Sequence, residues 1–175
     1  MRSRGLAVGS AVIVAALIVA GCSGGGSHPA KSPGGGSHPA KSPSRKPTSA
    51  PPATKAAIGK AYAAVFGTKS TLAESVASLQ NGSALKAIVV AESKKPAAKG
   101  SGARVTAVSL RSSNVAKVTF TIYSQGTPAL PNARGFAVQQ GGKWKVAAQT
   151  FCSLLSLQGS TPKPCTDPKI TALPG

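Results

Sequence analysis

Residues 133–148 read ARGFAVQQGGKWKVAA, and this stretch decides the fold of the C-terminal half. Apolar and polar side chains alternate from Ala133 to Gln140 and again from Lys143 to Ala148, which is the period of a half-buried β-strand. Gln140-Gly141-Gly142 lies between the two runs and is typical of a tight turn. We therefore expect two antiparallel strands joined as a hairpin.

Two further strands are expected upstream of this hairpin. Val118, Phe120 and Ile122 alternate with polar residues over positions 117–123, and Arg104–Arg111 shows the same period. The turn signal Ser112-Ser113-Asn114 separates the two segments. The chain therefore predicts an antiparallel sheet of about four strands.

Helical periodicity precedes the sheet and returns after it. Thr71 and Glu74 have the spacing of a capping box, in which hydroxyl and carboxylate exchange hydrogen bonds with the first amides of a helix. The helical segments are 54–66, a second from Thr71, 83–94 and a short last one at 151–157. The predicted class is α+β, with the N-terminal helices packed on one face of a curved, cone-like sheet.

The first residues have the pattern of an export signal. Arg2 and Arg4 precede an uncharged apolar run, and Val19-Ala20-Gly21 leads to Cys22. This ending resembles a bacterial lipobox, which implies cleavage after residue 21 and a diacylglycerol thioether (palmitate or a similar chain) on Cys22. An ordinary secretory signal and an uncleaved anchor are the alternatives. We expect a lipoprotein on the extracytoplasmic face of the cell membrane.

Residues 22–53 are expected to form a linker. The ten-residue unit GGGSHPAKSP occurs twice in succession, and the whole stretch lacks large apolar side chains. Such a segment buries too little surface to offset its chain entropy, so we expect disorder. The predicted organisation is a signal peptide (1–21), this linker and an α+β domain (54–175).

The charge balance points to anionic partners. The formal net charge is +18, and +16 remains after residues 1–21 are removed. Export makes nucleic acid an unsuitable partner, so wall polymers, lipid headgroups or an envelope protein are expected, with a merely solvated lysine surface as the alternative. The candidate contacts are Lys94, Lys95, Lys99, Arg104, Lys143 and Lys145.

Two cysteines remain if Cys22 carries lipid. In an oxidising compartment Cys152 and Cys165 are expected to form a disulfide. The closed loop has fourteen residues, for which chain entropy allows about 3 kcal/mol of stabilisation. Two thiols are too few for the usual zinc site, so we expect no metal.

Residues 136–146 and 151–157, FAVQQGGKWKV and FCSLLSL, carry a family resemblance. They resemble the exported low-molecular-weight antigen family of mycobacteria and their relatives, over about residues 55–158. The resemblance implies a cone-shaped fold similar to that of nuclear transport factor two. It implies no particular biochemical activity, because that fold carries enzymes and binding modules alike.

No catalytic group is evident in residues 54–175. The segment has no histidine, and its acids, Glu74, Glu92 and Asp167, fall outside the predicted strands. General acid–base catalysis requires a titratable group at the reacting atom, so we expect no enzyme and no cofactor. The alternative is a carrier of a small apolar ligand or lipid, with a pocket lined by Phe120, Ile122, Tyr123, Phe136 and Trp144. A domain of this size also needs large apolar side chains to fill its core, and the simpler interpretation is that these five do so.

Overall fold

The computed structural model describes residues 48–175. The predicted signal peptide, Cys22 and most of the predicted linker lie outside the described residues. The elements in chain order are β1 (Thr48–Ser49), α1 (Pro52–Phe66), α2 (Leu72–Ala77), α3 (Gly82–Ser93), the 3-10 turn η1 (Pro96–Ala98), β2 (Ser101–Leu110), β3 (Val115–Ser124), β4 (Thr127–Gln140), β5 (Lys143–Val146), α4 (Ala148–Leu157), α5 (Lys163–Thr166) and α6 (Pro168–Thr171).

The strands form one antiparallel sheet in the order β1-β2-β3-β4-β5. The α+β class is confirmed, but the sheet has five strands where about four were predicted. The additional strand, β1, pairs Thr48 with Leu110 and Ser49 with Ser109. Its two residues lie in a stretch without apolar alternation, so no period-two signal marks them. The described fold therefore starts before residue 54, the predicted domain boundary.

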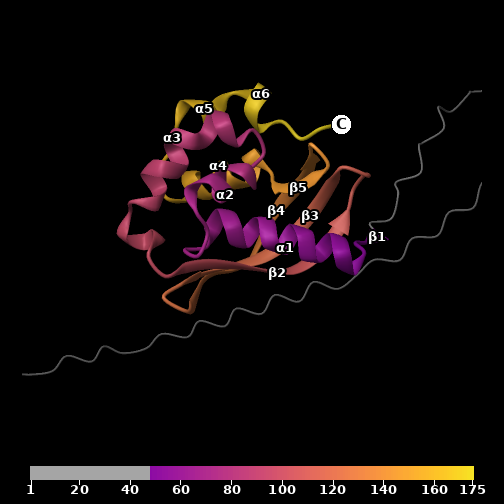
Figure 1. Cartoon of the computed structure of the whole chain (residues 1–175), viewed down its shortest axis with the longest axis horizontal. Coiled ribbons are helices and arrows are strands. Elements are labelled where there is room, and N and C mark those ends of the chain that lie inside the picture. Colours follow the sequence, from indigo (N-terminus) through magenta and orange to yellow (C-terminus); the bar gives the residue numbers. More distant parts are fainter. Residues whose placement is uncertain (1–47) are drawn as a thin grey trace, which may run out of the picture. The chain divides into compact units, whose positions relative to one another are not determined.

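Helix α1 lies against one face of the sheet and explains its curvature. It begins with Pro52 in the first turn, where a missing amide hydrogen costs nothing, and ends at Phe66, just before the extended Gly67. Its buried residues are Ile58, Ala61 and Tyr62. The helix packs mainly on β2 and β5, which are separated in the sheet by β3 and β4. The strands therefore bend around α1 (Figure 1).

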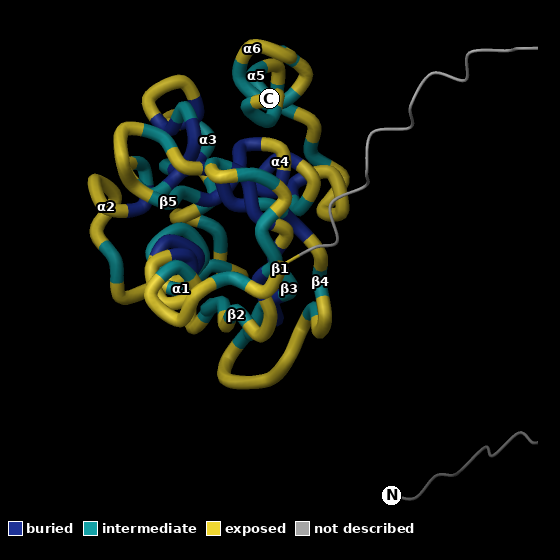
Figure 2. Tube along the Cα trace, turned by 90° about the vertical axis from the view of Figure 1, so that its right-hand side faces the viewer, coloured by how far each residue is buried: buried dark blue, intermediate teal, exposed yellow. Residues whose placement is uncertain are grey.

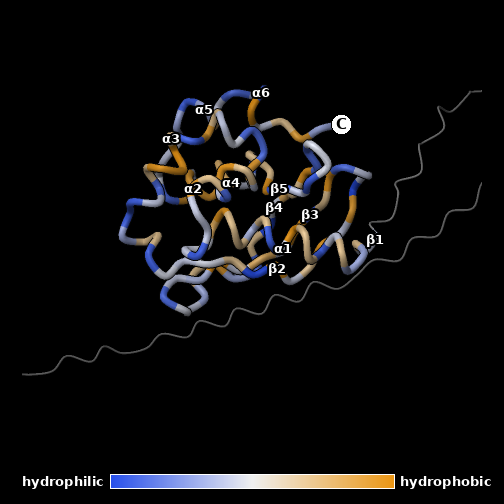
Figure 3. The backbone as a smooth tube through the Cα atoms, in the orientation of Figure 1, coloured by the Kyte–Doolittle hydropathy of each residue, from blue (hydrophilic) through white to orange (hydrophobic). Residues whose placement is uncertain are grey.

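Four aromatic side chains fill the space between the helices and the sheet. Tyr62 and Phe120 are completely buried, with ring centroids 4.8 Å apart. Phe66 lies 6.2 Å from Phe120 and 6.4 Å from Phe151. Figure 2 shows the buried segments gathered around this centre, and Figure 3 shows hydrophilic residues mainly in the loops outside it. Aromatic rings at such separations make favourable tilted and stacked contacts.

Several predicted element ends are wrong by a few residues. β4 begins at Thr127 rather than Ala133, and α4 begins at Ala148, which was assigned to the last strand. Leu79 lies two residues beyond the end of α2 and forms an isolated parallel bridge with Val146 of β5. Ala147 and Ala148 suit either a strand or a helix, which hides the start of α4, and Pro128 and Pro131, which are rare inside strands, hide the start of β4.

The C-terminal tail is held against the domain by covalent and polar contacts. The predicted disulfide between Cys152 and Cys165 is confirmed, with the two Cα atoms 5.4 Å apart. The side-chain amide of Gln80 donates to the carbonyl oxygen of Ala172 over 2.9 Å, and its oxygen accepts from the amide of Ala148 over 3.0 Å. Helices α5 and α6, which were not predicted, belong to this tail.

Within residues 48–175, no helix combines the length and the apolar character that crossing a membrane requires.

Candidate binding surface

The two faces of the sheet differ in what covers them. On β3, Ala116, Val118 and Phe120 are buried in the main core with α1 and α4, whereas Lys117 between them is exposed. Successive side chains of a strand point to opposite faces. We call the face that carries Lys117 the outer face.

The neighbouring strands follow the same alternation. On β4, Gly135 lies next to Thr150 of α4, so Arg134 and Phe136 project to the outer face. On β2, Ala103 and Val105 pack against the main core, which places Arg104 between them on the outer face.

The strand register brings four cations together on the outer face. Lys117 is opposite Phe136 on β4, and the guanidinium carbon of Arg111 lies 5.8 Å from the centroid of the Phe136 ring. Arg134 is opposite Thr119 of β3, and Arg104 is opposite Thr121 of the same strand. We call Arg104, Arg111, Lys117 and Arg134 the outer-face cations; all four are exposed.

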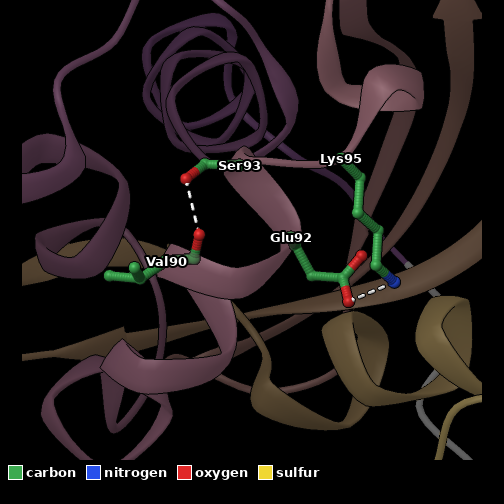
Figure 4. Close-up of polar contacts among 4 residues, drawn as sticks. All are labelled: Val90, Glu92, Ser93 and Lys95. Atoms are coloured by element: carbon green, nitrogen blue, oxygen red, sulfur yellow. Dashed lines mark hydrogen bonds and ion pairs between the residues drawn. The ribbon is translucent and has the colours of Figure 1, made fainter.

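The three acidic residues of the described chain lie elsewhere and are engaged. Glu74 on α2 closes the predicted capping box, and hydrogen bonds from the backbone amide and then the hydroxyl of Thr71 lower the pKa of its carboxyl. Glu92 on α3 forms an ion pair of 2.6 Å with Lys95 (Figure 4). Asp167 accepts a hydrogen bond from the amide of Lys169 at the start of α6.

Part of the charge imbalance of the described chain therefore lies on the sheet without compensation. Residues 48–175 contain fifteen basic and three acidic residues, a formal surplus of twelve. No described strand residue is acidic, so the outer-face cations have no carboxylate among them. An uncompensated cluster of this kind attracts anions.

The six cations proposed from the sequence fall in different places. Lys94, Lys95 and Lys99 lie around η1, between α3 and β2, and Lys95 is partly neutralised by Glu92. Arg104 is one of the outer-face cations. Lys143 is exposed at the start of β5, while Lys145 is half-buried opposite Val138. Three outer-face cations, Arg111, Lys117 and Arg134, were missed because each stands alone in sequence.

The five residues proposed to line a pocket also separate. Phe120 and Ile122 belong to the main core, and Trp144 packs against it from β5. Phe136 lies on the outer face in a second small cluster with Val115, Val138, Ala147 and Leu173. Tyr123 is half-buried near the end of β3. The sheet thus places these side chains on both of its faces.

Two shallow hollows lie at the β5 end of the domain. One, of about 600 Å³, is formed by α2, α3 and Lys145. The other, of about 450 Å³, lies between α1, α2 and the β4–β5 turn and includes Trp144, Lys60 and Glu74. No group of three or more histidine, cysteine or acidic side chains in residues 48–175 is arranged to hold a metal ion.

The buried Tyr62 is the titratable side chain most changed by its surroundings. Burial raises the pKa of its hydroxyl, an effect that the side chain of Thr150 opposes in part. The hydroxyl donates to the carbonyl oxygen of Phe136 over 3.0 Å. A phenol that stays protonated and is committed to the backbone acts as a structural link between α1 and β4.

A family model agrees with this fold. The model described as the C-terminal domain of the low molecular weight antigen MTB12 matches residues 50–162, more than half of the chain. The chain belongs to this family. The predicted resemblance is therefore confirmed, and the MTB12 domain here comprises β2 to β5 and helices α1 to α4. Cys165 lies beyond the match, so the disulfide joins the MTB12 domain to the tail.

No curated protein and no solved structure matches the chain. The likeness to nuclear transport factor two stays a prediction.

Proposed function

We propose that this protein is a lipoprotein anchored through Cys22 to the extracytoplasmic face of the cell membrane. In this proposal its MTB12 domain is a non-enzymatic module that binds an anionic component of the cell envelope. The observation that carries the proposal is the group of outer-face cations, which face solvent without a carboxylate among them.

An extracytoplasmic location and a positively charged domain are consistent with each other in this proposal. Disulfides persist in oxidising compartments, and the Cys152–Cys165 bond suits an exported chain. Outside the membrane, the abundant polyanions are wall polymers and lipid headgroups. A surplus of twelve positive charges on residues 48–175 raises the local concentration of such partners through its long-range field.

The absence of catalysis is part of the proposal and rests on the chemistry of the described side chains. Tyr62 is buried and hydrogen-bonded to the backbone. Glu74 and Glu92 are held by Thr71 and Lys95. A general acid or base must reach substrate with a proton to exchange, and these groups are already engaged.

The anchor is tested by intact-mass analysis of the protein extracted from its own membranes. We expect a mature chain that begins at Cys22 and carries the mass of fatty acyl chains. A Cys22→Ala variant should lose that mass and leave the membrane fraction. A native chain that retains Met1, or starts at another residue without acyl mass, contradicts the proposed anchor.

The binding role is tested by sedimenting the mature protein with purified cell wall. We expect retention that weakens steeply as salt concentration rises, because exposed charges are screened. Albumin, an acidic protein, serves as the unretained control. Failure of the wall to retain the protein at low salt contradicts the proposed function.

A further inference from the structure

The outer-face cations are spaced regularly along the strands. Three successive outward positions on β3 are Lys117, Thr119 and Thr121. We call each of these positions, together with the residues opposite it on β2 and β4, a row. The first row contains Lys117 itself, the Thr119 row contains Arg134 of β4, and the Thr121 row contains Arg104 of β2. Each step of two residues along the strand therefore carries one cation.

A fourth row continues the series at the other end of β3. The amide of Arg111 donates to the carbonyl oxygen of Val115 over 2.8 Å, so Arg111 stands beside the row that precedes Lys117. Its guanidinium lies over Phe136, which is opposite Lys117. The side chain is thereby directed along the outer face toward the next cation.

The repeat distance follows from strand geometry. Two residues of an antiparallel strand advance about 7 Å, so four rows span roughly 20 Å. A linear polymer with one negative charge about every 7 Å would match this advance when it lies over β3, where the long side chains of Arg104 and Arg134 must reach it from β2 and β4, about 5 Å to either side. A folded protein partner would have to present its carboxylates with the same repeat.

The chemistry of the rows favours phosphate. Three of the four cations are arginine, whose planar fork donates two parallel hydrogen bonds to phosphate or carboxylate oxygens. Thr119 adds a hydroxyl between Lys117 and Arg134. Because a β-sheet twists, the rows do not form a straight line. A flexible chain of polyol phosphates can follow that twist, whereas a chain of rigid uronate rings follows it poorly.

A bilayer fits this face less well. Membrane-surface binding combines cations with exposed apolar side chains that enter the headgroup region. The exposed large apolar residues of the described chain are Leu72 on α2 and Leu157 on α4, and neither lies on the sheet.

We propose that the outer face of the sheet binds a linear polymer of phosphodiesters, with one phosphate beside each of Arg104, Arg134, Lys117 and Arg111. The polymer lies along β3 and spans the four rows. This inference rests on the proposed function and narrows it to one face and one class of envelope polymer.

The test uses synthetic glycerol phosphate oligomers and the mature chain in isothermal titration calorimetry. We expect affinity to rise as the oligomer grows to about four phosphates and then to level off, once the rows are filled. An affinity that rises uniformly well beyond that length indicates diffuse attraction and overturns the proposal.

Matched variants locate the binding face. Lys117→Gln and Arg134→Gln should each weaken binding about fivefold, the effect of one well-placed cation near an anionic surface. The controls Lys69→Gln and Lys163→Gln remove the same charge at exposed sites on the α1–α2 loop and α5. Equal losses from all four variants, with unchanged melting temperatures, place the binding elsewhere and overturn the proposal.

Two comparisons distinguish the polymer class. Polygalacturonate of the same charge count should bind more weakly than the glycerol phosphate oligomer, and so should phosphatidylglycerol vesicles at the same phosphate concentration. Equal or tighter binding of either overturns the phosphodiester assignment. If purified cell wall retains Lys117→Gln and Lys69→Gln equally well, this inference is refuted and the proposed function is not. If the wall does not retain the natural protein at all, the proposed function is refuted.

Discussion

The backbone of Gly135 on β4 passes so close to Thr150 on α4 that no side chain fits between them. A Cβ atom on Gly135 would lie 2.5 Å from Cγ2 and 2.8 Å from Oγ1 of Thr150. The Thr150 hydroxyl oxygen accepts from the amide of Phe136 over 2.7 Å, and Tyr62 donates to the carbonyl oxygen of Phe136. Glycine thus allows α1, β4 and α4 to meet at one residue, Phe136.

Gly135→Ala should destabilise the domain. The added methyl group displaces Thr150 or Tyr62 from hydrogen bonds to Phe136, and overpacking of this kind costs about 1–3 kcal/mol. Denaturant unfolding of the variant and the natural protein measures the difference. Gly102→Ala is the control, because a Cβ there meets no atom within 4 Å. Equal stability of the two variants would show that Thr150 can move away from the added methyl group at no measurable cost.

Gly59→Ala should have the opposite effect. Gly59 lies inside α1, and a Cβ at this position meets nothing within 4 Å. Alanine restricts the unfolded chain and favours the helix, so we expect about 0.5–1 kcal/mol of added stability. Thermal unfolding followed by circular dichroism tests this expectation. A lower melting temperature would mean that the exposed side of α1 has a contact that a methyl group disturbs.

The strands were predictable where a large apolar side chain recurs at every second position. Val118, Phe120 and Ile122 in β3 are such a series, and all three contact the main core. The same signal fails for β1, because Thr48 and Ser49 are polar and depend on pairing with Leu110 and Ser109. A two-residue strand at a sheet edge is determined by its neighbour rather than by its own side chains.

The outer-face cations show a different limit of sequence reasoning. Arg104 and Arg134 are 30 positions apart, and they share the outer face because β3 pairs with β2 on one side and β4 on the other. Their strands have irregular register, with shifts between Val105 and Ala107 and after Phe120. A shift of one residue would turn one of these side chains to the other face. The alternation predicts which strands exist, while the register decides which cations meet.

Cys165→Ser should lower the free energy of unfolding by about 3 kcal/mol, the value expected for closing a loop of this length. The Cys152–Cys165 bond restricts the conformations of the unfolded natural protein, whereas the unfolded serine variant has no such restriction. Chemical denaturation with and without a thiol reductant measures the effect. Reductant should destabilise the natural protein by a similar amount and leave Cys165→Ser unchanged. The side-chain amide of Asn81 also donates to the carbonyl oxygen of Ile170 in the tail, over 2.8 Å. A variant as stable as the oxidised protein would show that the hydrogen bonds of Gln80 and Asn81 hold the tail sufficiently by themselves.

Glu74→Gln should remove a pH-dependent part of the stability. The carboxylate accepts from the amide of Thr71 over 2.7 Å and from its hydroxyl over 2.9 Å, which lowers the pKa of Glu74 in the folded state. A depressed folded pKa stabilises the protein above the ordinary carboxyl pKa, and that contribution is lost as pH falls through the folded value. The natural protein should therefore exceed the variant in stability at neutral pH, and the difference should vanish in acid.

The salt dependence of that difference separates the capping bonds from the general charge. If Glu74 acted mainly as one negative charge among fifteen described cations, added salt would screen its contribution. Short hydrogen bonds from Thr71 are screened much less, so we expect the pH-dependent difference to persist in high salt. Thr71→Ala removes the hydroxyl but keeps the amide, and should reduce the difference without abolishing it. A difference that disappears in salt would instead assign the effect of Glu74 to the surplus of cations around α2.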